Sequence, residues 1–144
     1  MKVNYSIVWI ALLTLTVGSA CAQDMPKNTS PEGASVYIIS PADGEVVSSP
    51  VTVKFGLQGM GVAPAGIAYP NSGHHHLLIN ATAMPALNMP IPADDVHRHF
   101  GKGQTETKVE LAPGTYTLQM LLGDQNHVPH DPPVMSEKIT IVVK

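Results

Sequence analysis

The residues best suited to chemistry in this sequence are its histidines. All seven lie between positions 74 and 130, in three groups. Imidazole nitrogens are common ligands of zinc and copper, and three or four that converge are enough to hold either ion. The sequence therefore predicts a transition-metal site, copper or zinc, with six candidate ligands: His74, His76, His97, His99, His127 and His130.

The first group is predicted to lie in a strand from His74 to Asn80. Alternate side chains of a strand share a face, so His74 and His76 point one way and His75 points the other way, with Leu77 and Ile79. His97 and His99 fall in a long proline-rich loop over 81–103. His127 and His130 fall in a polar loop over 123–133. Loops at strand ends are where a sandwich usually places its sites.

Acidic and sulfur-containing side chains lie close to the histidine groups in the sequence. Carboxylates often orient a ligating imidazole through its second N–H, although Asp124 and Asp131 also suit the making of turns. Thioethers are soft ligands that favour copper(I). The candidates for these two roles are Asp94, Asp95, Asp124 and Asp131, and Met84, Met89 and Met135.

Two other functions fit the same residues. The histidines could form a metal-independent hydrogen-bonded network that fixes the two long loops, as in a structural or interaction module of the cell envelope. A metal-bound water could also support a hydrolase. Motifs of serine hydrolases, zinc proteases and phosphate-binding loops do not occur, so an enzyme is the weaker expectation, and no cofactor beyond a metal is predicted.

The first 22 residues are typical of a secretory signal peptide. Lys2 precedes an apolar run, and Ala20-Cys21-Ala22 suits cleavage after Ala22. Gly18–Cys21 is an alternative, weak lipobox that would leave a lipid anchor on Cys21. The chain is therefore expected to be periplasmic or secreted, with a disordered tether over 23–34 and one domain over 35–144.

Charge limits the partners of the mature chain. Removal of the signal peptide takes away one cation, Lys2, and leaves seven Lys and Arg residues against eleven Asp and Glu residues. Such a surface does not suit nucleic acid or anionic lipid. The expected partners are a metal ion or an envelope protein, with membrane contact only through an anchor on Cys21.

Short apolar segments with a period of two recur along the domain, and turn residues bound each of them. This pattern predicts a single-domain, all-β fold, an immunoglobulin-like antiparallel β-sandwich without a disulfide. The predicted strands are Ser35–Ile39, Pro50–Leu57, His74–Asn80, Thr105–Leu111, Tyr116–Leu122 and Met135–Val143.

Several of these segments together resemble a bacterial family, the domain of unknown function DUF4399. The resemblance rests on Gly73–Ile79, His99–Glu106, Leu111–Gln119, Gly123-Asp124, His127–His130 and Pro132–Ser136, and it covers Val36 to Val143. It implies export and does not imply an activity.

A fainter resemblance is to the periplasmic copper carriers of the CopC family. Ser40–Gly44 with Val51–Phe55 is similar to the start of that sandwich, and Leu111–Tyr116 is similar to its closing hairpin. That family uses a histidine at the mature N-terminus for copper, whereas Gln23 or an acylated Cys21 offers none. The resemblance therefore implies the fold more than the metal.

Overall fold

The structure is a computed structural model that describes residues 27–144 of the chain. The predicted signal peptide and Cys21 lie outside these residues. The part described consists of strands and connecting loops, and no helix in it is long and apolar enough to cross a membrane. The strands are β1 (Ser35–Ser40), β2 (Val46–Val47), β3 (Val51–Gln58), β4 (Gly61–Val62), β5 (Ser72–Ile79), β6 (His97–Phe100), β7 (Glu106–Val109), β8 (Gly114–Gly123) and β9 (Ile139–Val143).

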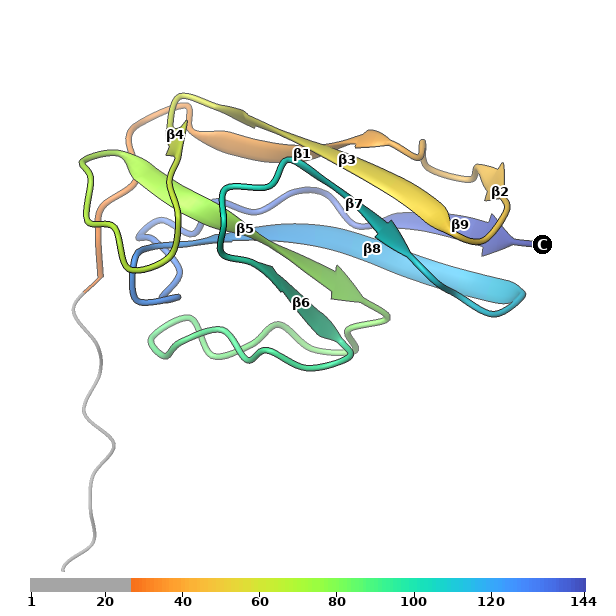
Figure 1. Ribbon diagram of the computed structural model, residues 1–144. Coiled ribbons are helices and arrows are strands. Elements are labelled where there is room, and N and C mark those ends of the chain that lie inside the picture. The colour runs from red at the N-terminus through yellow and green to blue at the C-terminus, as the bar shows by residue number, and fades with distance from the viewer. Residues whose placement is uncertain (1–26) are drawn as a thin grey trace, which may run out of the picture.

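The strands form two sheets that pack face to face (Figure 1). The smaller sheet has the order β1-β3-β7, and the larger has the order β2-β9-β8-β5-β4, with β6 also paired to β5. The main pairings are antiparallel, and only the two-residue strands β2 and β4 pair in parallel. Residues 27–144 contain no cysteine. The prediction of an all-β sandwich without a disulfide is therefore confirmed.

The core lies between the two sheets and follows the predicted alternation. Burial of these apolar side chains provides the main stabilising free energy, about 1.5–3 kcal/mol for each large one. Most of the alternate residues of these strands are buried there: Val51, Val53 and Phe55 from β3, Leu118, Met120 and Leu122 from β8, and Ile141 and Val143 from β9. Tyr116 and Ile139, which the same alternation places inside, are partly buried and pack against this core.

Strand β5 is buried on both of its faces, because a long loop covers the side that the smaller sheet does not. Its core-facing side carries Leu77 and Ile79, together with His75, whose ring lies 4.8 Å from that of Phe55. Its outer side carries Leu78, which belongs to a second apolar cluster with Ala81, Ile91 and Leu121. Figure 1 shows the loop between β5 and β6 running along this outer face.

Several segments differ from the sequence prediction. The last predicted strand, over 135–143, begins only at Ile139, and the two-residue strands β2 and β4 were not predicted. Residues 97–100, predicted to be loop, form strand β6 and pair with β5. The segment before β1, predicted to be a tether over 23–34, is attached to the domain from Asn28 onward. Backbone hydrogen bonds join Asn28 and Ser30 to Asp131, and the hydroxyl of Ser30 donates to the carbonyl of Pro132.

Candidate metal centre

Four imidazole rings meet on the outer face of the larger sheet. The ring centroid of His74 lies 4.8 Å from that of His76, 5.0 Å from that of His99 and 4.9 Å from that of His127. The centroids of His99 and His127 are 4.8 Å apart. The four residues, called the histidine cluster below, come from β5, β6 and the loop after β8.

His74 and His76 form the buried side of the histidine cluster. Both side chains are fully buried, and neither ring nitrogen of either residue has a hydrogen-bond partner. They share the outer face of β5, as the period of two predicts. Buried polar atoms are nearly always paired in folded proteins, so these four nitrogens are available to a ligand.

His99 reaches the cluster because β6 pairs with β5. The strand register places His99 directly opposite His76. A side chain at Gly101 would collide with the His99 ring, so the glycine leaves the ring its space. His99 is exposed, and it forms part of the open side of the cluster.

His127 enters from the loop between β8 and β9 in a backbone conformation that histidine rarely adopts. Its φ angle is +66°, in the left-handed region that disfavours residues with a Cβ atom. The backbone N–H of His127 donates to the carbonyl of Asp124 at 2.9 Å, and its own carbonyl accepts from the N–H of Ile91 at 2.9 Å. These contacts hold the strained residue against the loop that covers the sheet.

The buried carboxylate of Asp124 organises this loop. Its Oδ1 accepts hydrogen bonds from the backbone N–H groups of Asn126 at 2.8 Å and Val128 at 2.9 Å, on either side of His127. Its Oδ2 accepts one from the side-chain amide of Asn28 at 3.1 Å. Of the two roles considered for Asp124, the structure places it in turn-making, because its bonds go to the backbone and to Asn28.

Burial and mutual repulsion keep the inner imidazoles neutral. Burial lowers the pKa of His74 to about 4, with smaller contributions from His127 and His99. Burial likewise lowers the pKa of His76 to about 2, with His74 next in effect. The pKa of His99 is also lowered, first by burial and then by His127. Neutral imidazole is the form that binds a metal.

Three of these rings are arranged as metal ligands. His74, His99 and His127 each offer one nitrogen, and the three nitrogens lie within 4.8 Å of one another. The Nε2 atoms of His99 and His127 are 3.2 Å apart. Two nitrogens bound to zinc at 2.0–2.1 Å in tetrahedral geometry lie about 3.3 Å apart. One pair is therefore already at ligand spacing.

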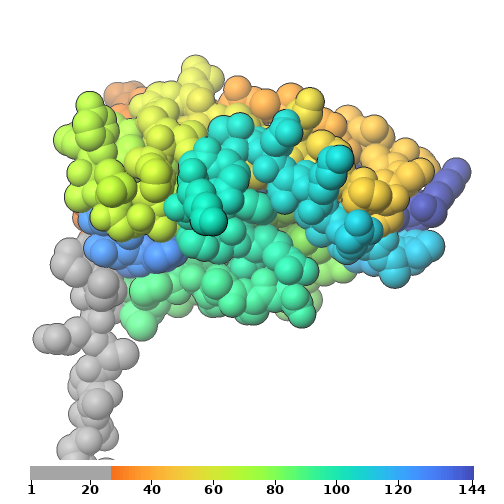
Figure 2. All heavy atoms as spheres, viewed as in Figure 1, coloured from red at the N-terminus to blue at the C-terminus, as the bar shows by residue number. Residues whose placement is uncertain are grey.

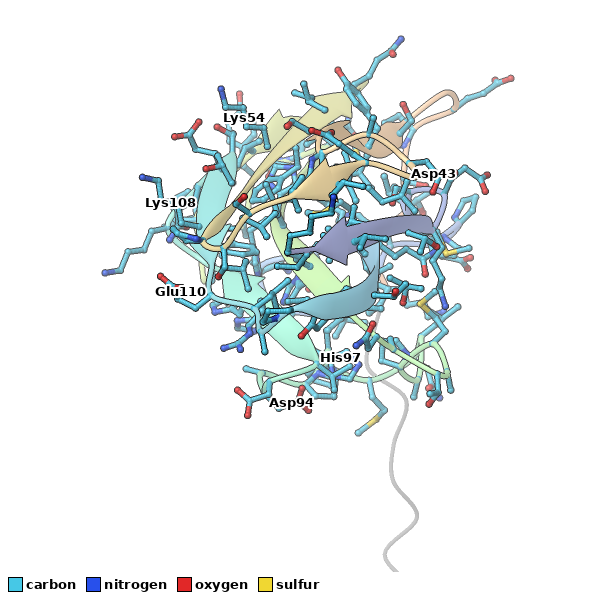
Figure 3. The ribbon with its side chains drawn as sticks, turned by 90° about the vertical axis from the view of Figure 1, so that its right-hand side faces the viewer. Asp43, Lys54, Asp94, His97, Lys108 and Glu110 are labelled. Carbon is cyan, nitrogen blue, oxygen red and sulfur yellow. The ribbon has the colours of Figure 1, made fainter. Side chains whose placement is uncertain are left out.

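His97 and His130, the other two candidate ligands, are not in the cluster. The ring of His97 donates from Nδ1 to Asp94 at 2.9 Å, and Figure 3 shows these two residues side by side. His130 is buried, and its Nε2 donates to the carbonyl of Ser72 at 3.2 Å. A local hydrogen bond thus engages one ring nitrogen of each residue, while Nδ1 of His130 is buried without a partner. His75 lies on the other side of β5 and donates from Nδ1 to the carbonyl of Gln104.

The other polar and sulfur candidates lie elsewhere. Asp94 bonds His97, Asp95 pairs with Arg98 at 3.3 Å, and Asp131 uses its backbone to hold Asn28 and Ser30. The three methionines Met84, Met89 and Met135 are exposed. The group of potential ligands is thus made of imidazole nitrogens alone. The cluster lies near strand ends, as the sequence argument expected, because His74 pairs with Gly123, the last residue of β8, and His127 is in the loop that follows.

The comparisons with known proteins identify a family. The family model of a domain of unknown function, DUF4399, matches residues 53–144. This match covers more than half of the chain, and the chain belongs to that family. No curated protein and no solved structure matches the chain.

Proposed function

We propose that this member of the DUF4399 family is an exported protein that binds a transition metal ion, copper or zinc, through His74, His99 and His127. The observation that carries the proposal is that all four ring nitrogens of the fully buried His74 and His76 are unpaired beside the rings of His99 and His127. A purely structural network would pair these nitrogens with each other or with the backbone, because each unpaired buried polar group costs about 1–3 kcal/mol. A metal ion would bind them instead.

The donor set limits the class of metal. Nitrogen ligands suit zinc and copper, whereas calcium and magnesium prefer oxygen ligands. The group consists of three histidines and contains no thiolate or thioether, the ligands that favour copper(I). Zinc and copper(II) are therefore the two ions that the group suits.

Exposure of the outer ligands supports a role in exchange. His99 is exposed and His127 is partly exposed, while His74 is fully buried. An ion in the histidine cluster would be reachable by a partner from the side of these two residues. We infer a carrier, buffer or sensor of metal in the cell envelope, with the ion or an envelope protein as its partner.

Metal content and calorimetry test this proposal. The protein is purified without an affinity tag, its metal content is measured, and the metal-free form is titrated with zinc and copper(II). We expect a dissociation constant in the micromolar range or lower. His127→Ala should weaken the affinity at least about 100-fold. The loss of a group that only supports a ligand already costs about 10–100-fold, and the loss of the ligand itself should cost more. His97→Ala is the matched control and keeps the affinity. Wild-type protein without such binding would overturn the proposal.

Export is supported by the features of residues 1–22 described above. The N-terminus of the protein recovered from the periplasm distinguishes the two forms. Intact mass spectrometry is expected to give a chain that begins at Gln23, whereas a diacylated Cys21 would indicate a lipoprotein. A protein that stays in the cytoplasm with residues 1–22 still attached would overturn this part of the proposal.

A further inference from the structure

His76 has no role in the three-ligand group, although it lies against it. Its ring centroid is 4.8 Å from that of His74, 5.2 Å from that of His99 and 6.0 Å from that of His127. We propose that His76 is the fourth ligand of a closed, tetrahedral four-imidazole site whose geometry suits zinc. This inference rests on the proposed function.

The spacing of the four ring centroids is close to that of such a site, although only the nitrogens of His74, His99 and His127 lie within 4.8 Å of one another, so the ring of His76 would have to turn to bind. A metal 2.0–2.1 Å from an imidazole nitrogen lies about 3.2 Å from the ring centroid, so tetrahedral coordination places ring centroids about 5.2 Å apart. The six centroid distances of the histidine cluster run from 4.8 to 6.0 Å. Four points whose six mutual distances are similar form a tetrahedron. In a square-planar arrangement two of the six distances, the diagonals, would be clearly longer than the other four.

The burial of His76 points to the same role. The side chain is fully buried and both of its nitrogens are unpaired. Its ring packs so closely on Gly123 that a Cβ atom there would lie 2.8 Å from the ring carbon Cε1. If this position served packing alone, an apolar side chain such as leucine would fill it. Burial of an imidazole here costs free energy unless its nitrogen has a partner.

Two consequences follow for the chemistry of the site. Zinc has no geometric preference of its own and commonly takes four tetrahedral ligands, whereas copper(II) favours tetragonal geometry. A zinc ion with four protein ligands keeps no position for water, as in structural zinc sites. A histidine cluster with four ligands would therefore hold an ion and would not activate water for hydrolysis.

Cobalt(II) is the probe for coordination number, because tetrahedral cobalt(II) absorbs visible light far more strongly than five- or six-coordinate cobalt(II). The metal-free protein is loaded with cobalt(II), and its spectrum is compared with those of His76→Ala and His76→Gln. We expect an intense tetrahedral spectrum for the wild type. Both variants should still bind cobalt(II) through the other three histidines, with shifted absorption bands, because water oxygen replaces an imidazole nitrogen, and with weaker bands where a second water raises the coordination number to five.

X-ray absorption of the zinc-loaded wild type gives a second measurement that needs no variant, and it should show four imidazoles. His97→Ala is the control, since it changes a histidine of β6 outside the histidine cluster. This variant should leave the cobalt(II) absorption spectrum unchanged. Three imidazoles with a water, or an unchanged spectrum in folded His76 variants, would overturn the fourth ligand while leaving the three-ligand site intact. Absence of any cobalt or zinc binding would overturn both.

Discussion

The Nε2 atoms of His99 and His127 lie 3.2 Å apart, although the residues are 28 positions apart in the chain. In the metal-free protein one ring must donate a proton to the other, since neutral imidazole has one donor and one acceptor nitrogen. To bind a metal, both nitrogens must be unprotonated, because each donates its lone pair to the ion. On the function proposed above, a metal would replace this hydrogen bond and join β6 to the loop after β8.

Metal should therefore stabilise the fold as well as occupy the site. At a free zinc concentration 100 times the dissociation constant, binding adds about 2.7 kcal/mol to the free energy of unfolding. For a domain of this size that corresponds to a rise in Tm of about 10 °C or more. Thermal unfolding followed by circular dichroism, with and without zinc, measures the rise. A chelator should reverse it, and a Tm that zinc does not move would contradict the prediction.

The free energy of unfolding of the metal-free protein should fall as the pH is lowered below 6.5. His74 and His76 have pKa values of about 4 and about 2 in the folded state, below the unfolded value of 6.5. Between these values the unfolded chain binds more protons, so stability is fully present above pH 6.5 and is lost as the pH falls toward the folded values. Urea unfolding at pH 7.5, 6 and 5 measures this loss. A stability that is constant over that range would refute it.

Asp124→Ala should weaken metal binding through His127. The change removes the acceptor for the backbone N–H groups of Asn126 and Val128, and the free energy of unfolding should fall by about 2–4 kcal/mol. Zinc affinity should fall about 10–100-fold, as for other groups that orient a ligand. Calorimetry in the wild-type and His127→Ala backgrounds separates the two effects, because the loss of affinity should disappear once His127 is absent.

Asp131→Ala is the matched control for this variant. Asp131 lies in the same loop and is exposed, and its backbone rather than its side chain makes the contacts to Asn28 and Ser30. Affinity and stability should both stay close to wild type. An equal loss in Asp131→Ala would mean that the whole loop, and not the Asp124 carboxylate, sets the position of His127.

Gly101→Ala should displace the ring of His99. The added Cβ atom would meet the ring, with Nε2 at 2.5 Å, so the imidazole must turn away. Zinc affinity should fall at least about 10-fold, since a group needed for the position of a ligand is disturbed. Gly114→Ala, where the nearest atom of Tyr116 lies at an ordinary 3.5 Å, is the control. Calorimetry that gives equal affinities for the two variants would contradict this role of Gly101.

An open groove lies beside the histidine cluster. It has a volume of about 780 Å³ and is lined by residues of β6 and β7 and the loop before β6, including His97, His99 and Lys108. Figure 2 shows the β6 and β7 region, in teal and cyan, on the front of the molecule. A partner that takes the ion from His99 would approach along this surface.

The sequence predicted the sandwich well because its pattern is local. Alternation in β3, β8 and β9 needs only neighbouring residues, and most of those side chains are buried as expected. The same rule placed His74 and His76 on one face of β5. Strand β6 was missed because it has four residues, too few to show a period, and its pairing with β5 is decided by tertiary contact.

The composition of the histidine cluster could not be predicted from spacing. His97 and His99 alternate in sequence just as His74 and His76 do, yet only His99 joins the cluster, because Asp94 bonds the ring of His97. His127 reaches the cluster through a left-handed backbone conformation that depends on Asp124. Such contacts across the fold leave no periodic trace in the chain.

The hydrogen bond between Asn28 and Asp124 joins residues 96 positions apart. A contact of this span forms only when nearly the whole domain has emerged and folded, and such long-range contacts are slow to form. The loop that carries His127 can make this contact only when residues 28 and 124 have both emerged. On the export and metal binding proposed above, a chain that crosses the membrane unfolded would have no complete site and would bind its metal only after crossing.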